Sequence, residues 1–353
     1  MKPYPIDFVI PWVDGSDPAW QKSKARYLAI AEGREPESDN GAEEKGGAAG
    51  ENIDAADDRY RDWDILPYWF RAVEKYAPWV RTIHFVTCGQ TPAWMNTEAE
   101  GLHLVDHRDF IPARYLPVFS SHPIELNLHR IPGLAEHFVY FNDDFYLTAP
   151  VRRSDFFRNG LPCDMIEEKP PMYPRDELYN YILVNDIVFA NAHFSRKQFL
   201  KEHRDKWFSM EAPRAALRNL YFSRLNKNYF FGFDIHHLPM AYRKKTFEKV
   251  WDMDEERLNA TCCHRFRDFR DVSQCVFKYT QLLTGEFAPY DKNRFGKLFK
   301  LGDSLEETCR AIESQQYKMI CINDTGVEDF EGSKAALIAS FEKMFPEKSR
   351  FEL

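Results

Sequence analysis

The chain has 353 residues, of which 44% are hydrophobic and 29% charged, so it is long enough to bury a large core as one domain or two and is not disordered. Its formal net charge is −8, but ten acids and two bases between Ala31 and Asp58 account for all of it, so the remainder is neutral and offers no basic face to nucleic acid. No apolar run approaches the ~20 residues that span a bilayer, and the first ten residues lack a signal-peptide pattern. We therefore expect a cytoplasmic bacterial protein without an integral membrane segment, and peripheral attachment to the inner face of the membrane stays open.

The seven cysteines indicate reduced thiols rather than a disulfide framework. A zinc site is an alternative use for four neighbouring residues, and its ligands would be Cys262, Cys263, His264 and Cys275. Their spacing matches no common zinc pattern, so the sequence disfavours that site.

Residues 6–13 predict the first strand, which ends in the turn Asp14-Gly-Ser-Asp-Pro18. Ser16 or Asp17 is expected to cap a helix that starts near Ala19. Two acids on either side of Gly15 suit ligand contact at a strand end, although the motif taken by itself favours an ordinary Asx turn. Residues 32–56 predict a solvated, mobile acidic insertion, whose use as a lid stays open.

An amphipathic helix is predicted over residues 62–79, with Asp62 as its candidate cap. Further strands are predicted at 82–87, 102–105 and 138–141. A polar or glycine-containing cluster follows each strand, which is typical of a parallel sheet whose ligand edge lies at the strand carboxyl ends. The fold class is therefore α/β, with a mostly parallel, Rossmann-like central sheet. Its rim would hold Asp14, Gly89, Gln90, Asp106, Asp143 and Asp144.

The most informative stretch is Asn142-Asp143-Asp144, directly after an aromatic, β-branched strand. Carboxylates at this edge suit Mg²⁺ or Mn²⁺ shared with a phosphate, because both ions prefer oxygen ligands. A turn in which these side chains bond to nearby backbone is an equal alternative from this stretch alone.

The second half of the chain predicts a mostly helical cover over the sheet, with helices at 196–208, 212–223, 239–253 and 271–283. We expect three parts: residues 1–150 as the α/β part with the acidic insertion, residues 151–315 as a mostly helical part, and residues 316–353 as a strand and helix that return to the core. Two motifs here carry candidate chemistry, namely Asp234-Ile-His-His-Leu-Pro-Met240 and His264-Arg-Phe-Arg-Asp-Phe-Arg-Asp271. Capping histidines and a solvated charge run are the simpler interpretations of each.

Residues 317–325 repeat the pattern of a strand followed by Asn323-Asp324, so this strand is expected to join the same sheet and add a carboxylate to its rim. Residues 333–344 predict a closing helix, and residues 346–353 a frayed end.

Four separated blocks together resemble the Stealth family, which includes bacterial capsular and exopolysaccharide phosphotransferases and the catalytic part of animal N-acetylglucosamine-1-phosphotransferase. They are Ile6-Asp-Phe-Val-Ile-Pro-Trp-Val-Asp-Gly-Ser-Asp-Pro18; Arg59-Tyr-Arg-Asp62 through Glu74-Lys-Tyr-Ala-Pro-Trp79, Val86-Thr-Cys-Gly-Gln90 and Phe138-Val-Tyr-Phe-Asn-Asp-Asp144; His237-Leu-Pro-Met240 with Arg265-Phe-Arg267 and Asp271-Val-Ser273; and Cys321-Ile-Asn-Asp324. The chain departs from the family at Ile10-Pro11, where Tyr-Thr is usual, and at Cys88, where Asn is common.

The resemblance implies a nucleotide-sugar-transferase-like core and transfer of a sugar-1-phosphate from a UDP-sugar, such as UDP-GlcNAc, to a saccharide hydroxyl with release of UMP. It implies Mg²⁺ or Mn²⁺ as cofactor. The site residues that we expect from it are His237, Asp14 and Arg267 as catalytic; Asp17, Gly89, Gln90, Asn142, Asn323 and Arg265 as substrate-binding; and Asp143, Asp144 and Asp324 as metal ligands.

His237 is the first candidate for the general base and Asp14 the second. A metal-dependent glycosyltransferase that releases UDP is the alternative reaction, because the same carboxylates and metal serve both. A non-catalytic sugar- or nucleotide-binding module is a third reading, which the cluster of Asp, His and Arg argues against. The donor sugar, the acceptor polymer and homo-oligomerisation stay open.

Overall fold

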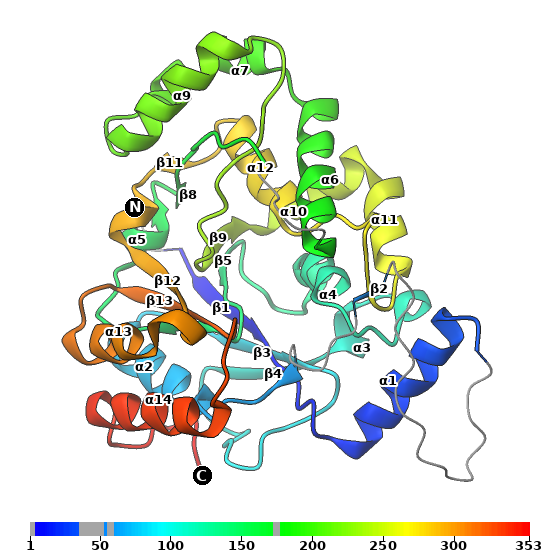
Figure 1. The fold of residues 1–353 in the computed structure, drawn as a ribbon, viewed down its shortest axis with the longest axis vertical. Coiled ribbons are helices and arrows are strands. Elements are labelled where there is room, and N and C mark those ends of the chain that lie inside the picture. Colours follow the sequence, from blue (N-terminus) through cyan, green and yellow to red (C-terminus); the bar gives the residue numbers. More distant parts are fainter. Residues whose placement is uncertain (1–3, 35–52, 55–59, 172–176) are drawn as a thin grey trace.

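A five-stranded sheet lies at the centre of the computed structural model, which describes residues 4–34, 53–54, 60–171 and 177–353 (Figure 1). Its strand order is β4-β3-β1-β5-β9. The first four of these strands run parallel, and β9 pairs antiparallel with β5 at the edge. The strands span β1 Ile6–Pro11, β3 Ile83–Thr87, β4 Leu102–Asp106, β5 His137–Tyr140 and β9 Met240–Arg243. The predicted α/β fold with a mostly parallel sheet is confirmed.

Both faces of this sheet are buried, as its near-continuous apolar strands require. Side chains alternate along β1, so Phe8 and Ile10 face one core while Val9 faces the other. The first core packs against α2 (Leu66–Tyr76), α13 (Leu301–Ser314) and α14 (Phe330–Met344). The second packs against α4 (Ser121–Asn127), α10 (Lys244–Met253), α11 (Glu255–Cys263) and α12 (Cys275–Leu283).

A second, three-stranded sheet carries the carboxyl-terminal strand, in the order β12-β13-β6. Its strands are β12 Gly296–Lys300, β13 Met319–Asn323 and β6 Phe145–Leu147. The expectation that the strand near residue 320 joins the central sheet is therefore wrong. It pairs antiparallel with β6, the continuation of the chain beyond β5, so the two sheets meet at the turn between β5 and β6.

The remaining elements are short or lie around this frame. Two further small sheets pair β11 (Ala288–Pro289) with β8 (Leu161–Asp164) and β7 (Phe157–Arg158), and β10 (Arg267–Asp268) with β2 (Ile53–Asp54). The other helices are α1 Pro18–Ala31, α3 His107–Phe110, α5 Arg153–Phe156, α6 Leu178–His193, α7 Arg196–Glu202, α8 Arg204–Trp207 and α9 Pro213–Leu225. In the described parts of the chain no helix has both the length and the apolar character to cross a bilayer.

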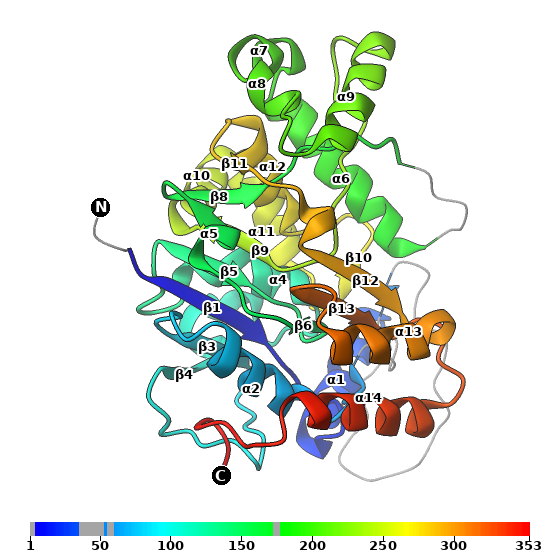
Figure 2. The ribbon, with the colours of Figure 1, turned by 90° about the vertical axis from the view of Figure 1, so that its left-hand side faces the viewer.

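The mostly helical second half is confirmed, and its helices α7 to α9 stand out from one end of the molecule (Figure 2). The helix predicted over 239–253 is partly wrong, because residues 240–243 form β9 and the helix begins at Lys244. Most of the acidic insertion lies outside the described residues, but residues 53–54 pair as a strand with β10.

Two predicted helix and terminus features differ from the structure. Asp62 does not cap α2, since the helix begins after Ile65 and Asp62 accepts a hydrogen bond from the backbone N–H of Asp64. The final residues are not frayed, because Phe351 is buried and Glu352 forms a bidentate pair with Arg71.

Candidate active site

The turn between β5 and β6 is held at both of its ends by backbone hydrogen bonds. The N–H of Phe141 donates to the carbonyl of Val9 in the central sheet, at 2.9 Å. The carbonyl of Asp144 accepts from the N–H of Ile322 in the second sheet, at 2.8 Å. The residues between them, Asn142 to Asp144, are thus fixed in the seam where the two sheets meet.

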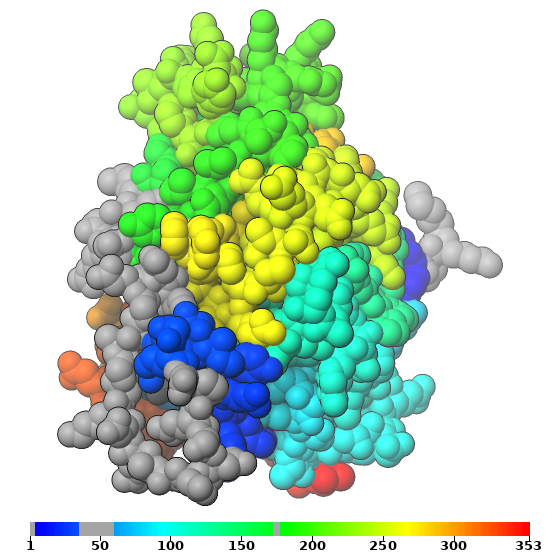
Figure 3. Space-filling view, turned by 90° about the vertical axis from the view of Figure 1, so that its right-hand side faces the viewer, coloured from blue at the N-terminus to red at the C-terminus, as the bar shows by residue number. Residues whose placement is uncertain are grey.

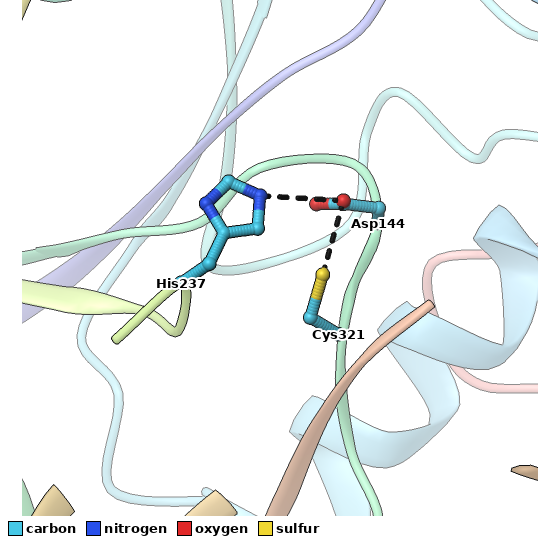
Figure 4. Close-up of side chains that lie close together, drawn as sticks. All are labelled: Asp144, His237 and Cys321. Atoms are coloured by element: carbon cyan, nitrogen blue, oxygen red, sulfur yellow. Dashed lines mark hydrogen bonds and ion pairs between the residues drawn. The ribbon is translucent and has the colours of Figure 1, made fainter. Parts of the chain in front are cut away.

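Three side chains from distant segments converge at this turn: Asp144, His237 and Cys321 (Figure 4). Nε2 of His237 forms an ion pair with Oδ2 of Asp144 at 3.6 Å, too long for a hydrogen bond. The thiol of Cys321 donates to the same oxygen at 3.1 Å. The ring of Phe145 packs edge-on against His237, with centroids 4.9 Å apart, and sets the plane of the imidazole.

His237 lies in an acidic environment. Burial lowers the pKa of its imidazole, but Asp144, Glu125 and Asp143 outweigh that effect and the net shift is upward. Burial, followed by repulsion from Asp144 and Asp62, raises the pKa of Asp143 to about 7. The residue as a whole is nevertheless exposed to solvent, so Asp143 is accessible from outside the protein.

The acidic turn fits a divalent cation by the chemistry of its oxygens. The buried Oδ1 atoms of Asn142 and Asp144 have no hydrogen-bond partner among the described residues. A buried oxygen without a hydrogen bond destabilises the fold, and the two neighbouring carboxylates of Asp143 and Asp144 repel each other. A bound cation would offset both effects. The histidine nitrogen and cysteine sulfur near Asp144 widen the ligand set beyond oxygen, and donor atoms of the three side chains lie within 4.8 Å of one another.

Asp14 lies at the end of β1, on the same rim as Asp62 and Asp143. Burial, together with the charges of Asp64 and Asp14, raises the pKa of Asp62. The charge of Asp62 in turn helps to raise the pKa of Asp143. Oδ1 of Asp14 accepts from the N–H and hydroxyl of Ser16, at 2.8 and 2.6 Å, so the simple Asx turn is present as well.

Gln90 holds the backbone of Asp14 from the end of β3. Its Oε1 accepts from the Asp14 N–H at 2.9 Å, and its Nε2 donates to the Asp14 carbonyl at 3.0 Å. Gly89 has φ +93°, and a side chain there would meet Oδ2 of Asp106 at 2.9 Å, so this turn requires glycine. Asp17 caps α1 by accepting from the N–H of Trp20 at 2.9 Å, as predicted.

Arg267 lies on β10, where Nη2 donates to the hydroxyl of Ser121 at 3.4 Å. Its charge lowers the pKa of Tyr179, although burial raises that pKa by more. Arg265, two residues earlier, faces elsewhere: it donates to the carbonyl of Leu116 at 3.1 Å and lies over the ring of Tyr27.

Asn323 and Asp324 follow β13, close to Cys321 in the chain but outside the three-residue cluster. Asn323 accepts a hydrogen bond from the hydroxyl of Thr325. Asp324 forms an ion pair with Arg61 at 3.6 Å. Among the described residues, the group of possible metal ligands at this turn consists of Asp144, His237 and Cys321 and does not include Asp324.

Four residues at this site were not among those predicted: Cys321, Glu125, Asp62 and Arg61. Cys321 reads as an ordinary core residue in an apolar strand, and only its position two residues before Asn323 could have drawn attention to it. Glu125 is buried and accepts from the hydroxyl of Tyr140 at 3.1 Å, which no local pattern predicts. The alternative of a zinc site near residue 262 finds no support, because no candidate metal group among the described residues includes Cys262, Cys263 or Cys275.

Comparison with known proteins matches two regions of the chain to models of one protein family. Residues 4–31 match Stealth protein CR1, conserved region 1, and residues 59–164 match Stealth protein CR2, conserved region 2. These regions contain Asp14 and Asn142 to Asp144.

Relatives match over nearly the whole chain. Receptor polysaccharide phosphotransferase WefC of Streptococcus oralis is 39% identical, covering 99% of both chains. Capsular polysaccharide phosphotransferase WcwK of Streptococcus pneumoniae is 38% identical over 99% of both. Exopolysaccharide phosphotransferase cps2G of Lactiplantibacillus plantarum is 35% identical over 99% of this chain and 97% of that one.

Solved structures resemble the chain only weakly. The apo structure of the bifunctional glycosyltransferase WbbM has a TM-score of 0.39 and 10% identity, covering 97% of this chain and 50% of that one. The galactosyltransferase LgtC has a TM-score of 0.31 and 11% identity, covering 79% and 94%. Likenesses at this level carry no information about the reaction.

Proposed function

The chain belongs to the Stealth family, and from that premise we propose that it transfers a hexose- or N-acetylhexosamine-1-phosphate from a UDP-sugar to a saccharide hydroxyl. The product is a phosphodiester in a capsular polysaccharide or exopolysaccharide, and UMP is released. UDP-GlcNAc is the first donor to try. The reaction is proposed to take place in the cytoplasm.

The observation that best supports this proposal is the seam between the two sheets. Its turn presents Asp143 and Asp144 beside a histidine whose Nε2 lies 3.6 Å from Asp144. Phosphoryl transfer needs charge neutralisation and in-line positioning more than covalent help, and these residues supply both a cation-binding edge and a proton acceptor.

The donor diphosphate is proposed to lie along the strand-end rim. Asp143 and Asp144 would hold Mg²⁺ or Mn²⁺, with the Asn142 amide oxygen beside them and Asp324 as a further candidate ligand. The bound ion would polarise the phosphate that carries the sugar and neutralise charge on the departing UMP.

The transfer step forms one P–O bond and breaks another. The acceptor hydroxyl oxygen attacks the sugar-bearing phosphorus, and the bond from that phosphorus to the bridging oxygen breaks, so UMP leaves with the electron pair. Nε2 of His237 takes the hydroxyl proton, with Asp14 as the second candidate. Arg267 holds the phosphoryl oxygens as negative charge redistributes.

The other predicted residues have positioning or binding roles in this proposal. Gln90 and Gly89 fix the β3 turn that supports Asp14, and Asp17 fixes the start of α1. Asn323 and Arg265 remain candidate substrate contacts. Residues 1–150 would bind the nucleotide sugar, residues 151–315 the acceptor, and residues 316–353 would complete the seam through β13.

The released nucleotide tests the reaction. The full chain is incubated with each of a panel of UDP-sugars, Mg²⁺ or Mn²⁺ and a saccharide acceptor, and the nucleotide is identified by chromatography. We expect UMP in amounts equal to the phosphodiester formed. UDP as the stoichiometric product would instead assign the chain to glycosyl transfer, and binding without turnover under every combination would assign it to a binding module.

A further inference from the structure

Helix α9 carries its large apolar side chains on the outside. The residues that it buries are Ala215 and Asn219, a small residue and a polar one. Its large apolar residues point to solvent, with Leu217 69%, Tyr221 60% and Leu225 59% exposed. A surface helix of a globular protein normally buries this face, so the pattern in α9 is the reverse of what core packing would select.

The exposed apolar surface continues beyond the helix itself. Met210 precedes α9 and Tyr229 follows it, and both are more than 60% exposed. Helix α9 and the residues on either side of it belong to the lobe that projects from one end of the molecule (Figure 1), and this green lobe also stands out in the space-filling view (Figure 3). We call the exposed apolar residues of this segment the α9 face: Met210, Leu217, Leu220, Tyr221, Leu225 and Tyr229.

Exposed basic residues lie on and beside helix α9. Residues 195–229 contain nine Lys and Arg against three Asp and Glu, and Arg196 and Arg218 pair with Glu168 and Glu167 outside this range, which leaves a surplus of four positive charges. Arg214, Arg224 and Lys227 are exposed and make no ion pair with any described residue. The lobe is therefore locally basic in a chain whose excess of acids lies in residues 31–58.

The lobe is firmly attached to the body of the protein. The side chain of Asn219 donates to the carbonyls of Ile166 and Trp207 and accepts from the N–H of Glu168. Arg196 pairs with Glu168 inside the lobe core. Arg218 of α9 pairs with Glu167, and Glu167 also pairs with His236, the residue before His237. The orientation of α9 is thereby linked to the loop that carries His237.

We propose that the α9 face docks on an anionic membrane surface. A helix with exposed leucines and tyrosines flanked by arginine and lysine suits the lipid interface, where apolar side chains enter the acyl boundary and bases meet anionic headgroups. At 13 residues α9 is ~20 Å long, shorter than the ~30 Å hydrocarbon core, so it lies along the surface and does not cross it. Docking would hold the site close to saccharides carried on that membrane.

Vesicle co-flotation of the full chain tests this surface. We expect the wild-type chain to float with vesicles of phosphatidylcholine and phosphatidylglycerol, to float poorly with phosphatidylcholine alone, and to detach as salt rises. The triple variant Arg214→Gln/Arg224→Gln/Lys227→Gln should bind about 100-fold more weakly, at about fivefold per base. Leu217→Ser/Tyr221→Ser/Leu225→Ser should weaken binding at least as much.

Matched controls separate this surface from general effects of charge and exposure. Lys245→Gln/Lys249→Gln/Arg310→Gln removes three exposed bases from other helices, and Ile30→Ser removes an exposed apolar side chain from α1. Both should float like the wild-type chain. Thermal unfolding of every variant establishes that each is folded.

Three results would overturn the proposal: no flotation of the wild-type chain with anionic vesicles, unchanged flotation of both α9 variants, or a dimer in sedimentation that the serine variant converts to monomers. The last would make the α9 face a contact between copies. The inference does not depend on the proposed reaction, because flotation is measured without substrate. Release of UMP with a soluble acceptor should be unchanged in both variants.

Discussion

The thiol of Cys321 donates a hydrogen bond to Oδ2 of Asp144, with 3.1 Å between the two atoms. A sulfur atom, which is a soft metal ligand, therefore lies beside a carboxylate oxygen, which is a hard one. Burial and the charges of Asp144 and Asp143 raise the pKa of the Cys321 thiol well above its ordinary value, which keeps the proton on sulfur in the absence of a cation. A sulfur ligand favours later transition metals, whereas carboxylates alone suit Mg²⁺.

Metal preference should therefore depend on Cys321. After chelation, we expect Mn²⁺ to restore UMP release at lower concentration than Mg²⁺, and Cys321→Ser to shift this preference several-fold toward Mg²⁺. Activity titrations with each ion measure the ratio. Cys309→Ser, on α13, is the matched control. An identical Mn²⁺ to Mg²⁺ ratio in Cys321→Ser and wild type would remove the thiol from the metal environment.

Asp143 and Asp144 should each be needed for turnover. Replacing either by Asn keeps the shape but removes the charge that would hold the cation. Changes to outer partners of metal ligands typically cost about 10- to 100-fold, so losing a ligand should cost at least about 100-fold. Asp252→Asn, an exposed residue of α10, should keep full activity. Near-normal rates in both Asp143→Asn and Asp144→Asn would place the metal elsewhere.

His237 and Asp14 are distinguished by their alanine variants. A positioned general base contributes about 100- to 10,000-fold, so His237→Ala should lose turnover on that scale while still binding UDP-sugar. Isothermal titration measures the binding and UMP release the rate. Asp14→Ala should lose less turnover than His237→Ala if Asp14 only holds a substrate. Near-full turnover in His237→Ala, with a large loss in Asp14→Ala, would reverse the two assignments.

The buried Asp7 should make stability depend on acid pH. Burial disfavours its charge, but hydrogen bonds from His84 and Arg81 outweigh burial and lower the pKa of Asp7. Its stabilisation is therefore complete above the unfolded pKa of about 4 and is lost as pH falls through the lower folded value.

Asp7→Asn should cost about 2 kcal/mol near pH 7, below the 3–5 kcal/mol typical of a broken buried pair, because Arg81 is 44% exposed. Denaturant unfolding from pH 7 to pH 3 measures the difference between variant and wild type, which should narrow below about pH 4. A constant difference across that range would mean that packing, and not charge, is responsible.

Local patterns were sufficient to predict the strand ends but not the partners of those strands. The apolar runs at β1, β3, β4 and β5 each end in polar residues, and the structure has a parallel strand at each. The run near Met319 has the same pattern, yet β13 pairs with β6. Pairing depends on where the chain turns after Asp144, which the period of apolar residues does not encode.

Tertiary contacts also decided the elements that the pattern assigned wrongly. Residues 240–243 form an edge strand because Tyr242 and Met240 pair beside β5, although the sequence continues smoothly into α10. Phe351 fixes the last residues because its ring packs against that of Phe70, with ring centroids 5.4 Å apart. Within the site, charged residues in polar motifs were predictable, whereas Cys321 and Glu125 come from apolar or helical surroundings.

The seam between the two sheets brings Cys321 against Asp144 across 177 positions of the chain. Contacts between residues so far apart in sequence carry a large entropy of loop closure, so this pairing forms only when both sheets are in place. The cluster at the turn is therefore a property of the whole fold, and no single segment of the chain holds it alone.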